Sequence, residues 1–340
     1  MSVDATAKLR IAGQAETGLA ARGLVPALAV LCLLAIAAAL PFLVKGFVVF
    51  QFTQVLIYAV AILGLNLLTG ISGQFSLGHG AFFAVGAYAA AIAIDSFGVG
   101  YVWTLPIAGM VCFAAGFLFG LPALRLEGIY LALATFALAV TTPQLLKLSV
   151  VAPWTGGVQG VFIAKPGAPF ALPLSDDQWL YFFTLAVGLV LYWTARNLMA
   201  SRTGRALLAI RENPIAARAM GINLSLYKSL AFGVSALYTG VAGALSAIVV
   251  QFVAPDSFTF VLSVALLVGL VVGGVGWLPG ALVGGIFIVF VPNIAEEVSK
   301  GLSGAVYGVI LILLIYLMPT GAAGLVQKSA GVFARLRLRL

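Results

Sequence analysis

The sequence predicts an all-α polytopic membrane protein, and its composition, its long apolar segments and its charge distribution support that fold class. Of 340 residues, 63% are hydrophobic and 8% are charged, and the mean hydropathy is +1.16. Soluble domains carry roughly 25% charged residues, so this chain has too few charges to cover the surface of a water-soluble core. The net charge of +8 indicates no nucleic-acid partner, because the charges lie in a few loops between apolar runs.

Ten segments are long and apolar enough for a helix that crosses a bilayer, which needs about 20 mostly apolar residues. We therefore expect about ten transmembrane helices (8–10). The candidate segments are residues 24–44, 47–69, 74–94, 101–122, 128–149, 179–199, 229–250, 259–275, 279–293 and 304–319.

The first of these segments follows a polar leader, residues 1–23. Ala37, Ala38 and Ala39 weakly resemble a signal-peptidase site. The apolar run is nearer a full span than the 7–15 residues of a signal peptide. We expect a retained first helix.

Basic residues predict the orientation, because they concentrate in cytoplasmic loops. The loop 195–229 carries six of them against one acid, and the tail 321–340 carries four. Counting spans back from these places residues 1–23 in the cytoplasm too. The expected organisation is a cytoplasmic segment 1–23, a transmembrane domain 24–320 containing the cytoplasmic loop 195–229, and a basic cytoplasmic tail 321–340. The long loop 151–178 is then extracytoplasmic.

The two halves of the chain resemble each other weakly at an offset of 170 residues. "LLTGISGQFS" (67–76) aligns with "LYTGVAGALS" (237–246). In this span count the two segments run in opposite directions, as in a five-plus-five inverted repeat, a common transporter plan. The alternative is that small-residue spacings recur wherever membrane helices pack closely.

A glycine-rich polar stretch interrupts the apolar chain at "GLNLLTGISGQFSLGHG", residues 64–80. Glycines weaken a continuous helix, and broken backbone at membrane depth is tolerated only inside protein or beside a wet cavity. We predict a broken helix near residues 70–80 that lines a translocation path. Its candidate path residues are Asn66, Thr69, Gln74, Ser76 and His79. The alternative, which we favour for His79, is that these groups only cap the half-helices and bind neighbouring helices.

The loop 195–229 contains a short segment, "ENPIAARAMG", with its own start and stop. Asn213 suits an N-cap, Pro214 the first helical position and Gly221 the position after the end. A short capped helix with small residues suits a groove on another protein, although an interfacial helix on anionic lipid is an equal reading from the residues alone.

No arrangement typical of catalysis or of a metal site occurs in the chain. No glycine precedes a lysine, so the phosphate loop G-x-x-x-x-G-K-[ST] is absent. We also find no paired carboxylates, no Cys/His cluster and no G-x-S-x-G. Cys32 and Cys112 lie in apolar runs, typical of inert core cysteines. The chain is expected to be no enzyme and to use no cofactor of its own, so any ATP is hydrolysed by a partner.

"GLNLLTGISGQFSLGHGAFFAVGAY" resembles the N-terminal signature of the larger permease subunit of branched-chain amino-acid ABC importers. Four later stretches agree in order: "LRLEGIYLALATFALA", "TGGVQG", "GRALLAIRENPIAARAMGIN" and "VGGVGWLPGALVG". The resemblance covers about residues 48–320. Permeases for urea and other amides share much of the pattern. Ala265 departs from it, because family members often carry a polar or acidic residue there, and this weakens any inference about substrate from that helix.

The resemblance implies a bacterial inner-membrane permease that forms half of a path for leucine, isoleucine or valine. Its expected partners are a second homologous permease, two cytoplasmic ATPase subunits, an extracytoplasmic solute-binding protein and membrane lipid. The resemblance also turns the capped segment into the expected ATPase coupling helix, with residues Arg211, Glu212, Asn213, Pro214, Ala216, Ala217, Arg218, Ala219 and Gly221. The competing class is an ion-coupled secondary transporter, which usually buries ionisable residues in its spans, whereas these spans are nearly free of them.

Overall fold

The computed structural model describes residues 32, 34–123, 126, 128–169, 173–298, 302–318 and 320–324. The chain divides into two compact units, Met1–Val49 and Phe50–Leu340. The described part of the first unit includes a short apolar helix, Leu34–Leu43.

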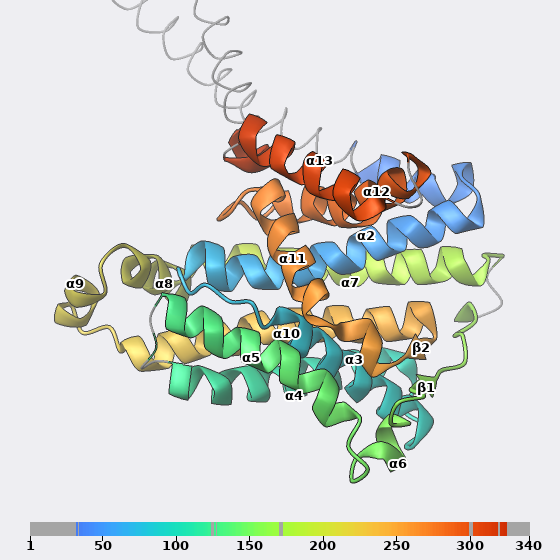
Figure 1. The fold of residues 1–340 in the computed structure, drawn as a ribbon, viewed down its shortest axis with the longest axis horizontal. Helices are drawn as coiled ribbons and strands as arrows, with labels where there is room; N and C mark the ends of the chain where they lie inside the picture. The colour runs from blue at the N-terminus through green and yellow to red at the C-terminus, as the bar shows by residue number, and fades with distance from the viewer. Residues whose placement is uncertain are drawn as a thin grey trace, which may run out of the picture. The chain divides into compact units, whose positions relative to one another are not determined.

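Most of the described chain is helical (Figure 1). From the first unit into the second runs α2 (Gly46–Leu65), which continues as the π-helical turn η1 (Asn66–Ile71). The other long helices are α3 (His79–Asp95), α4 (Tyr101–Ala123), α5 (Ile129–Leu146), α7 (Asp176–Ala200), α8 (Arg202–Glu212), α10 (Leu224–Val250), α11 (Phe260–Gly273), α12 (Gly280–Val298) and α13 (Ser303–Leu317). Short elements complete the list: α6 (Ala152–Thr155), α9 (Pro214–Ala219), the 3-10 turn η3 (Pro255–Phe258), β1 (Val161–Phe162) and β2 (Phe252–Val253).

Seven helices among the described residues are long and apolar enough to cross a membrane, and three shorter apolar helices accompany them. Each of the ten expected segments overlaps one of these helices. The prediction of an all-α polytopic membrane protein is therefore confirmed, whereas a count of ten crossings stays a prediction. The third segment begins later than expected, because residues 72–78 are not helical and α3 begins only at His79.

The long helix α10 is the most deeply buried span, and it packs chiefly against α4 and α3. Glycines permit this close approach. A Cβ on Gly240 would lie 2.5 Å from Cβ of Cys112 on α4, and one on Gly243 would overlap the carbonyl oxygen of Phe83 on α3. Residues 237–246 thus form a continuous packed helix, whereas the aligned residues 67–76 contain the interruption. The two aligned segments therefore have different backbones.

A glycine-lined hairpin joins α11 to α12. A Cβ on Gly273 or on Gly284 would overlap backbone of the facing helix or turn, at Gly280 and Gly269 respectively. Between the helices the turn 274–279 needs positive φ at Gly274 (107°) and Gly276 (83°), which glycine adopts at little cost. This turn packs against η1, at one end of the helix assembly.

A short β-ribbon lies at the opposite end of α10 from α8 and α9 (Figure 1). β1 and β2 pair antiparallel, with Val161 opposite Val253 and Phe162 opposite Phe252. The two phenylalanine rings lie 4.6 Å apart, between centroids. The ribbon therefore joins residues 161–162 to the chain that follows α10.

Candidate functional site

The predicted helix interruption is present between α2 and α3. The chain passes from α-helix through η1 into the irregular stretch 72–78, and regular helix resumes at His79. Gly73 has φ +73°, a conformation that costs other residues roughly 1–2 kcal/mol. A Cβ on Gly70 would lie 2.6 Å from the backbone nitrogen of Gly276. Both glycines are thus required by the local geometry, one by its φ and one by close backbone approach.

Asn66 connects the interruption to the α11–α12 turn. Its side chain is fully buried. Its Nδ2 donates to the carbonyl of Trp277 at 3.0 Å, and its Oδ1 accepts from the backbone nitrogen of Gly276 at 2.8 Å. One carboxamide therefore pairs the backbone nitrogen of Gly276 and gives a second donor to the carbonyl of Trp277, which also accepts from the nitrogen of Gly280 at 3.2 Å.

His79 connects the interruption to α10 and α2. Its Nε2 lies 2.6 Å from Ser235 Oγ, and its Nδ1 lies 3.1 Å from Ser76 Oγ. Ser235 donates its only proton to the carbonyl of Gly64 at 2.6 Å, because a carbonyl can only accept. Ser235 must then accept from Nε2–H. In the neutral ring Nδ1 accepts from Ser76, and both ring nitrogens are paired.

Gln74 and Thr69 form hydrogen bonds within the interruption, and Gln74 also bonds to α10. Gln74 Nε2 donates to Ser72 Oγ at 2.5 Å and to the carbonyl of Lys228 at 3.4 Å, and Thr69 Oγ1 donates to the carbonyl of Gln74 at 3.2 Å. Four of the five candidate path residues are buried within this chain, and Thr69 is half-buried. Their hydrogen bonds give them a structural role, and their contact with a path stays a prediction.

Sequence reasoning missed three hydroxyl residues that support the interruption: Thr135, Ser235 and Ser263. Thr135 Oγ1 accepts from the backbone nitrogen of Leu77 at 2.9 Å, and Ser263 Oγ accepts from that of Gly80 at 2.9 Å. Ser263 is the one hydroxyl of α11, whereas α5 and α10 carry several others besides Thr135 and Ser235. The isolated hydroxyl of α11 could have been identified from the sequence, because such groups bond to neighbouring helices inside membranes.

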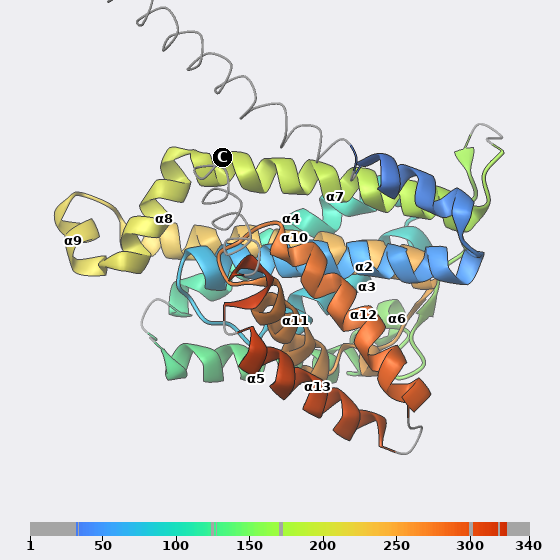
Figure 2. The same ribbon diagram turned by 90° about the horizontal axis from the view of Figure 1, so that it is seen from above.

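The predicted capped helix is present as α9. Asn213 Oδ1 accepts from the backbone nitrogens of Ile215 and Ala216 at 3.1 and 3.0 Å. At the far end Gly221 has φ +81°, and the bonds of residues 221 and 222 to the carbonyls of residues 218 and 217 complete a Schellman motif. All residues of α9 are exposed except Ala217. Figures 1 and 2 show α8 and α9 extending beyond the end of α2 in both views.

Two residues expected in the coupling helix belong to the preceding helix instead. Arg211 and Glu212 form the last turn of α8, because Asn213 ends one helix and begins the next. Glu212 is exposed. The side chain of Arg211 reaches back to η1, where its Nη1 donates to the carbonyl of Gly70.

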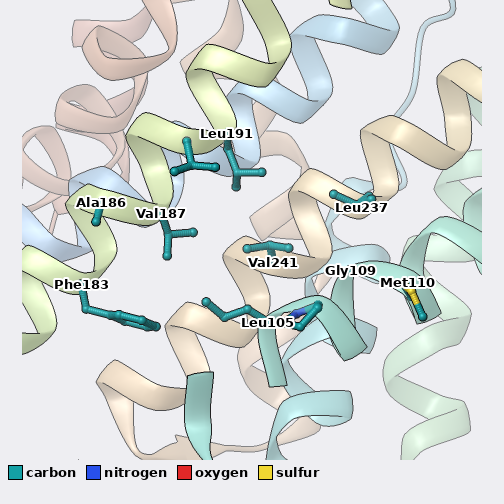
Figure 3. A pocket seen from close by; sticks show the side chains of 11 residues that line it. Leu105, Gly109, Met110, Phe183, Ala186, Val187, Leu191, Leu237 and Val241 are labelled. Atoms are coloured by element: carbon teal, nitrogen blue, oxygen red, sulfur yellow. The ribbon is translucent and has the colours of Figure 1, made fainter. Parts of the chain in front are cut away.

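An apolar groove of about 470 Å³ lies between α4, α7 and α10 (Figure 3). All of its lining residues are apolar: Leu105, Pro106, Gly109, Met110, Phe183, Ala186, Val187, Val190, Leu191, Leu237 and Val241. A zwitterionic or amide solute would lose its water there without gaining a hydrogen bond. This groove suits a lipid chain or a neighbouring helix. Among the described residues, no cluster of three or more His, Cys, Asp or Glu suits a metal ion.

Apolar spanning helices around an interrupted helix, with an exposed capped helix at one end, define a membrane transport protein. The model of the branched-chain amino acid transport system permease component matches residues 47–315, and the chain belongs to that family. The LivM permease proteins of Salmonella typhimurium and Escherichia coli K12 are 33% and 34% identical to it, over 86% and 85% of this chain and 73% of each relative. The LivH permease protein of Salmonella typhimurium is 24% identical, over 78% of this chain and 91% of its own. Each is described as part of a high-affinity branched-chain amino acid transport system. No solved structure matches the chain significantly.

Proposed function

We propose that this chain is the permease subunit of a binding-protein-dependent ABC importer for leucine, isoleucine and valine. It forms half of the translocation path, and a second, homologous permease forms the other half. The family match over residues 47–315 carries the proposal. Likeness to both LivM and LivH supports a paired permease, since these are two related permease proteins of the same named system.

The chain works in the bacterial inner membrane with ten crossings, arranged as a five-plus-five inverted repeat. Residues 1–23, 195–229 and 321–340 face the cytoplasm, residues 24–320 form the permease domain, and lipid surrounds the spans. The basic residues of the cytoplasmic segments support this orientation. So does the placement of α8 and α9 at one end of α10 and the β-ribbon at the other (Figure 1). The loop 151–178 then faces the binding protein.

Two cytoplasmic ATPase subunits drive transport, and one of them receives α9. The exposed face of α9 supports this docking, because Ile215 and Met220 are each 83% exposed and flank small alanines. One exposed isoleucine on a helix of six residues and a methionine at its C-cap give little area for lipid anchoring. A protein groove would bury them completely.

The interrupted helix borders the translocation path, and Asn66, Thr69, Gln74, Ser76 and His79 maintain its shape there. The concentration of polar groups at one point of an apolar chain supports this placement. Broken backbone in a membrane requires protein or water around it, and the hydrogen bonds of Asn66 and His79 supply protein on one side.

Reconstitution of the whole importer in lipid vesicles tests the proposal. With both permeases, the ATPases and the binding protein present, we expect ATP-dependent uptake of labelled leucine, competed by isoleucine and valine. ATP-driven uptake of urea or a short amide without leucine uptake would assign the chain to the amide permeases. Uptake driven by an ion gradient without ATPase subunits would overturn the ABC assignment.

A further inference from the structure

We propose that Arg211 is the positioning residue through which movement of α9 reaches the interrupted helix. The inference rests on the proposed function only in that α9 docks on the ATPase. Residue Arg211 touches neither solute nor nucleotide in this scheme. It holds η1 in a position that depends on the positions of α8 and α9.

The contact is specific in its geometry. Arg211 Nη1 donates to the carbonyl of Gly70, and the aliphatic part of the same side chain lies over Gly73. A Cβ on Gly73 would be 3.0 Å from Cγ of Arg211 and 3.5 Å from its Cβ. Glycine at residue 73 therefore permits the positive φ and also leaves room for the arginine.

Electrostatics favour a cation at this point. The last carbonyls of a helix have no intrahelical partner, and they carry the negative end of the helix dipole. Gly70 lies in the final turn of the helical segment that runs from Gly46 to Ile71. An arginine from another helix therefore caps this end with a charge-assisted bond, the stronger kind.

The contact continues beyond η1. One turn before Gly70, Asn66 bonds to Gly276 and Trp277 in the α11–α12 turn, and Gly70 itself packs against Gly276. A displacement of Arg211 thus acts on η1 and, through it, on a second interhelical turn. All of these groups lie at the end of the assembly from which α8 and α9 extend.

Only one residue separates α9 from the helix that carries Arg211. Asn213 is the C-cap of α8, with its backbone nitrogen bonded to the carbonyl of Ala209, and it is also the N-cap of α9. The joint is fixed by hydrogen bonds from both sides, so a push on α9 moves the last turn of α8. Leu207, one turn before Arg211, and Ile210 are buried and hold α8 in place.

Arg205 on the same helix provides a matched control. Like Arg211 it is exposed, but its Nη1 donates to the carbonyl of Ala200 at 2.9 Å, within its own segment of chain. Arg211→Met and Arg205→Met remove the same charge from α8 and retain a similar stem. Only the first breaks contact with η1.

The decisive measurement is the number of solute molecules transported per ATP in vesicles that contain the complete importer. We expect Arg211→Met to lower this ratio by at least about tenfold, the equivalent of one charge-assisted hydrogen bond, while membrane abundance and ATPase association stay normal. Arg205→Met, which breaks no contact with η1, should stay within about twofold of the unmodified protein. Arg211→Lys, which keeps the cation but not the planar fork, should fall between the two.

A second readout follows the interruption directly. Phe75 lies in it and is 40% exposed, so a Phe75→Cys variant in a Cys32→Ser background reports its exposure to a thiol reagent. We expect the labelling rate to change between nucleotide-free and ATP-bound importer, and to lose that change in Arg211→Met. An unchanged transport ratio together with a preserved nucleotide-dependent labelling change in Arg211→Met would overturn the inference. Absence of ATP-driven uptake in the unmodified importer would instead overturn the proposed function.

Discussion

Replacement of Asn66 by leucine removes the carboxamide that joins the interruption to the α11–α12 turn. The two side chains share the same branched skeleton of four heavy atoms, so the substitution removes two hydrogen bonds, of 3.0 and 2.8 Å, and the bulkier methyl groups add some crowding. It leaves the carbonyl of Trp277 and the nitrogen of Gly276 without this partner. The side chain is fully buried, so leucine itself meets no cost of exposure.

The expected loss follows from the surroundings of the two groups. Only the nitrogen of Gly276 is left unpaired, because the carbonyl of Trp277 also accepts from the backbone nitrogen of Gly280 at 3.2 Å. A buried polar group left unpaired costs about 1–3 kcal/mol, which gives an upper limit of about 3 kcal/mol. Interhelical bonds in membranes average only about 0.6 kcal/mol, so the loss of two gives a lower limit of about 1 kcal/mol. We therefore expect a loss of about 1–3 kcal/mol.

The assay is reversible unfolding of the purified permease in mixed micelles, followed by circular dichroism as the denaturing detergent is increased. Asn197→Leu on α7 is the control, because the same change occurs there at an exposed side chain and should shift the free energy of unfolding by less than about 0.5 kcal/mol. If the two variants unfold at the same detergent fraction, the Asn66 bonds contribute nothing to stability and the structural role assigned to this residue is wrong.

Three further predictions concern docking, packing and orientation. Ala216→Trp and Ala219→Trp on the exposed face of α9 should weaken ATPase association about 5- to 150-fold, since overpacking a fitted interface costs on the order of 1–3 kcal/mol; co-purification that matches the unmodified permease would remove α9 as the docking element. Gly240→Val should prevent accumulation in the membrane because Cys112 and Ala108 occupy the space, whereas Gly308→Val, with open space around it, should not; equal abundance of the two would contradict the packing argument. A cysteine at Val158, 65% exposed, should react with a membrane-impermeant reagent added to intact cells, and one at Ile215 should react only after permeabilisation; the opposite pattern would reverse the orientation.

Local chemistry allowed parts of this structure to be predicted from the sequence. The caps of α9 lie within residues 213–222, and every bond that defines them joins residues at most five apart. The interruption follows in the same way from glycines and polar residues that are neighbours in the chain. These features depend on backbone geometry that a few adjacent residues determine.

The partners of the polar residues could not be predicted, because they lie far away in the sequence. Asn66 bonds to residues 210 and 211 positions later, and His79 bonds to Ser235, 156 positions later. A polar residue in an apolar chain looks the same whether it faces a path or another helix. Arg211 shows the same limit, since sequence analysis placed it in the coupling helix while the structure turns it toward Gly70.

The hydrogen bonds around His79 run from donor to acceptor in one direction. His79 donates to Ser235, and Ser235 donates to the carbonyl of Gly64, where the chain of bonds ends. Ser235 gives its proton to a carbonyl, which has none to pass on, and Ser76 receives from the backbone nitrogen of Gly78, which does not exchange protons readily. A proton that entered the ring would therefore find no exit along this chain of bonds. The single histidine of the sequence therefore holds α10 and the interruption together. Coupling of transport to a proton gradient would have to use other groups.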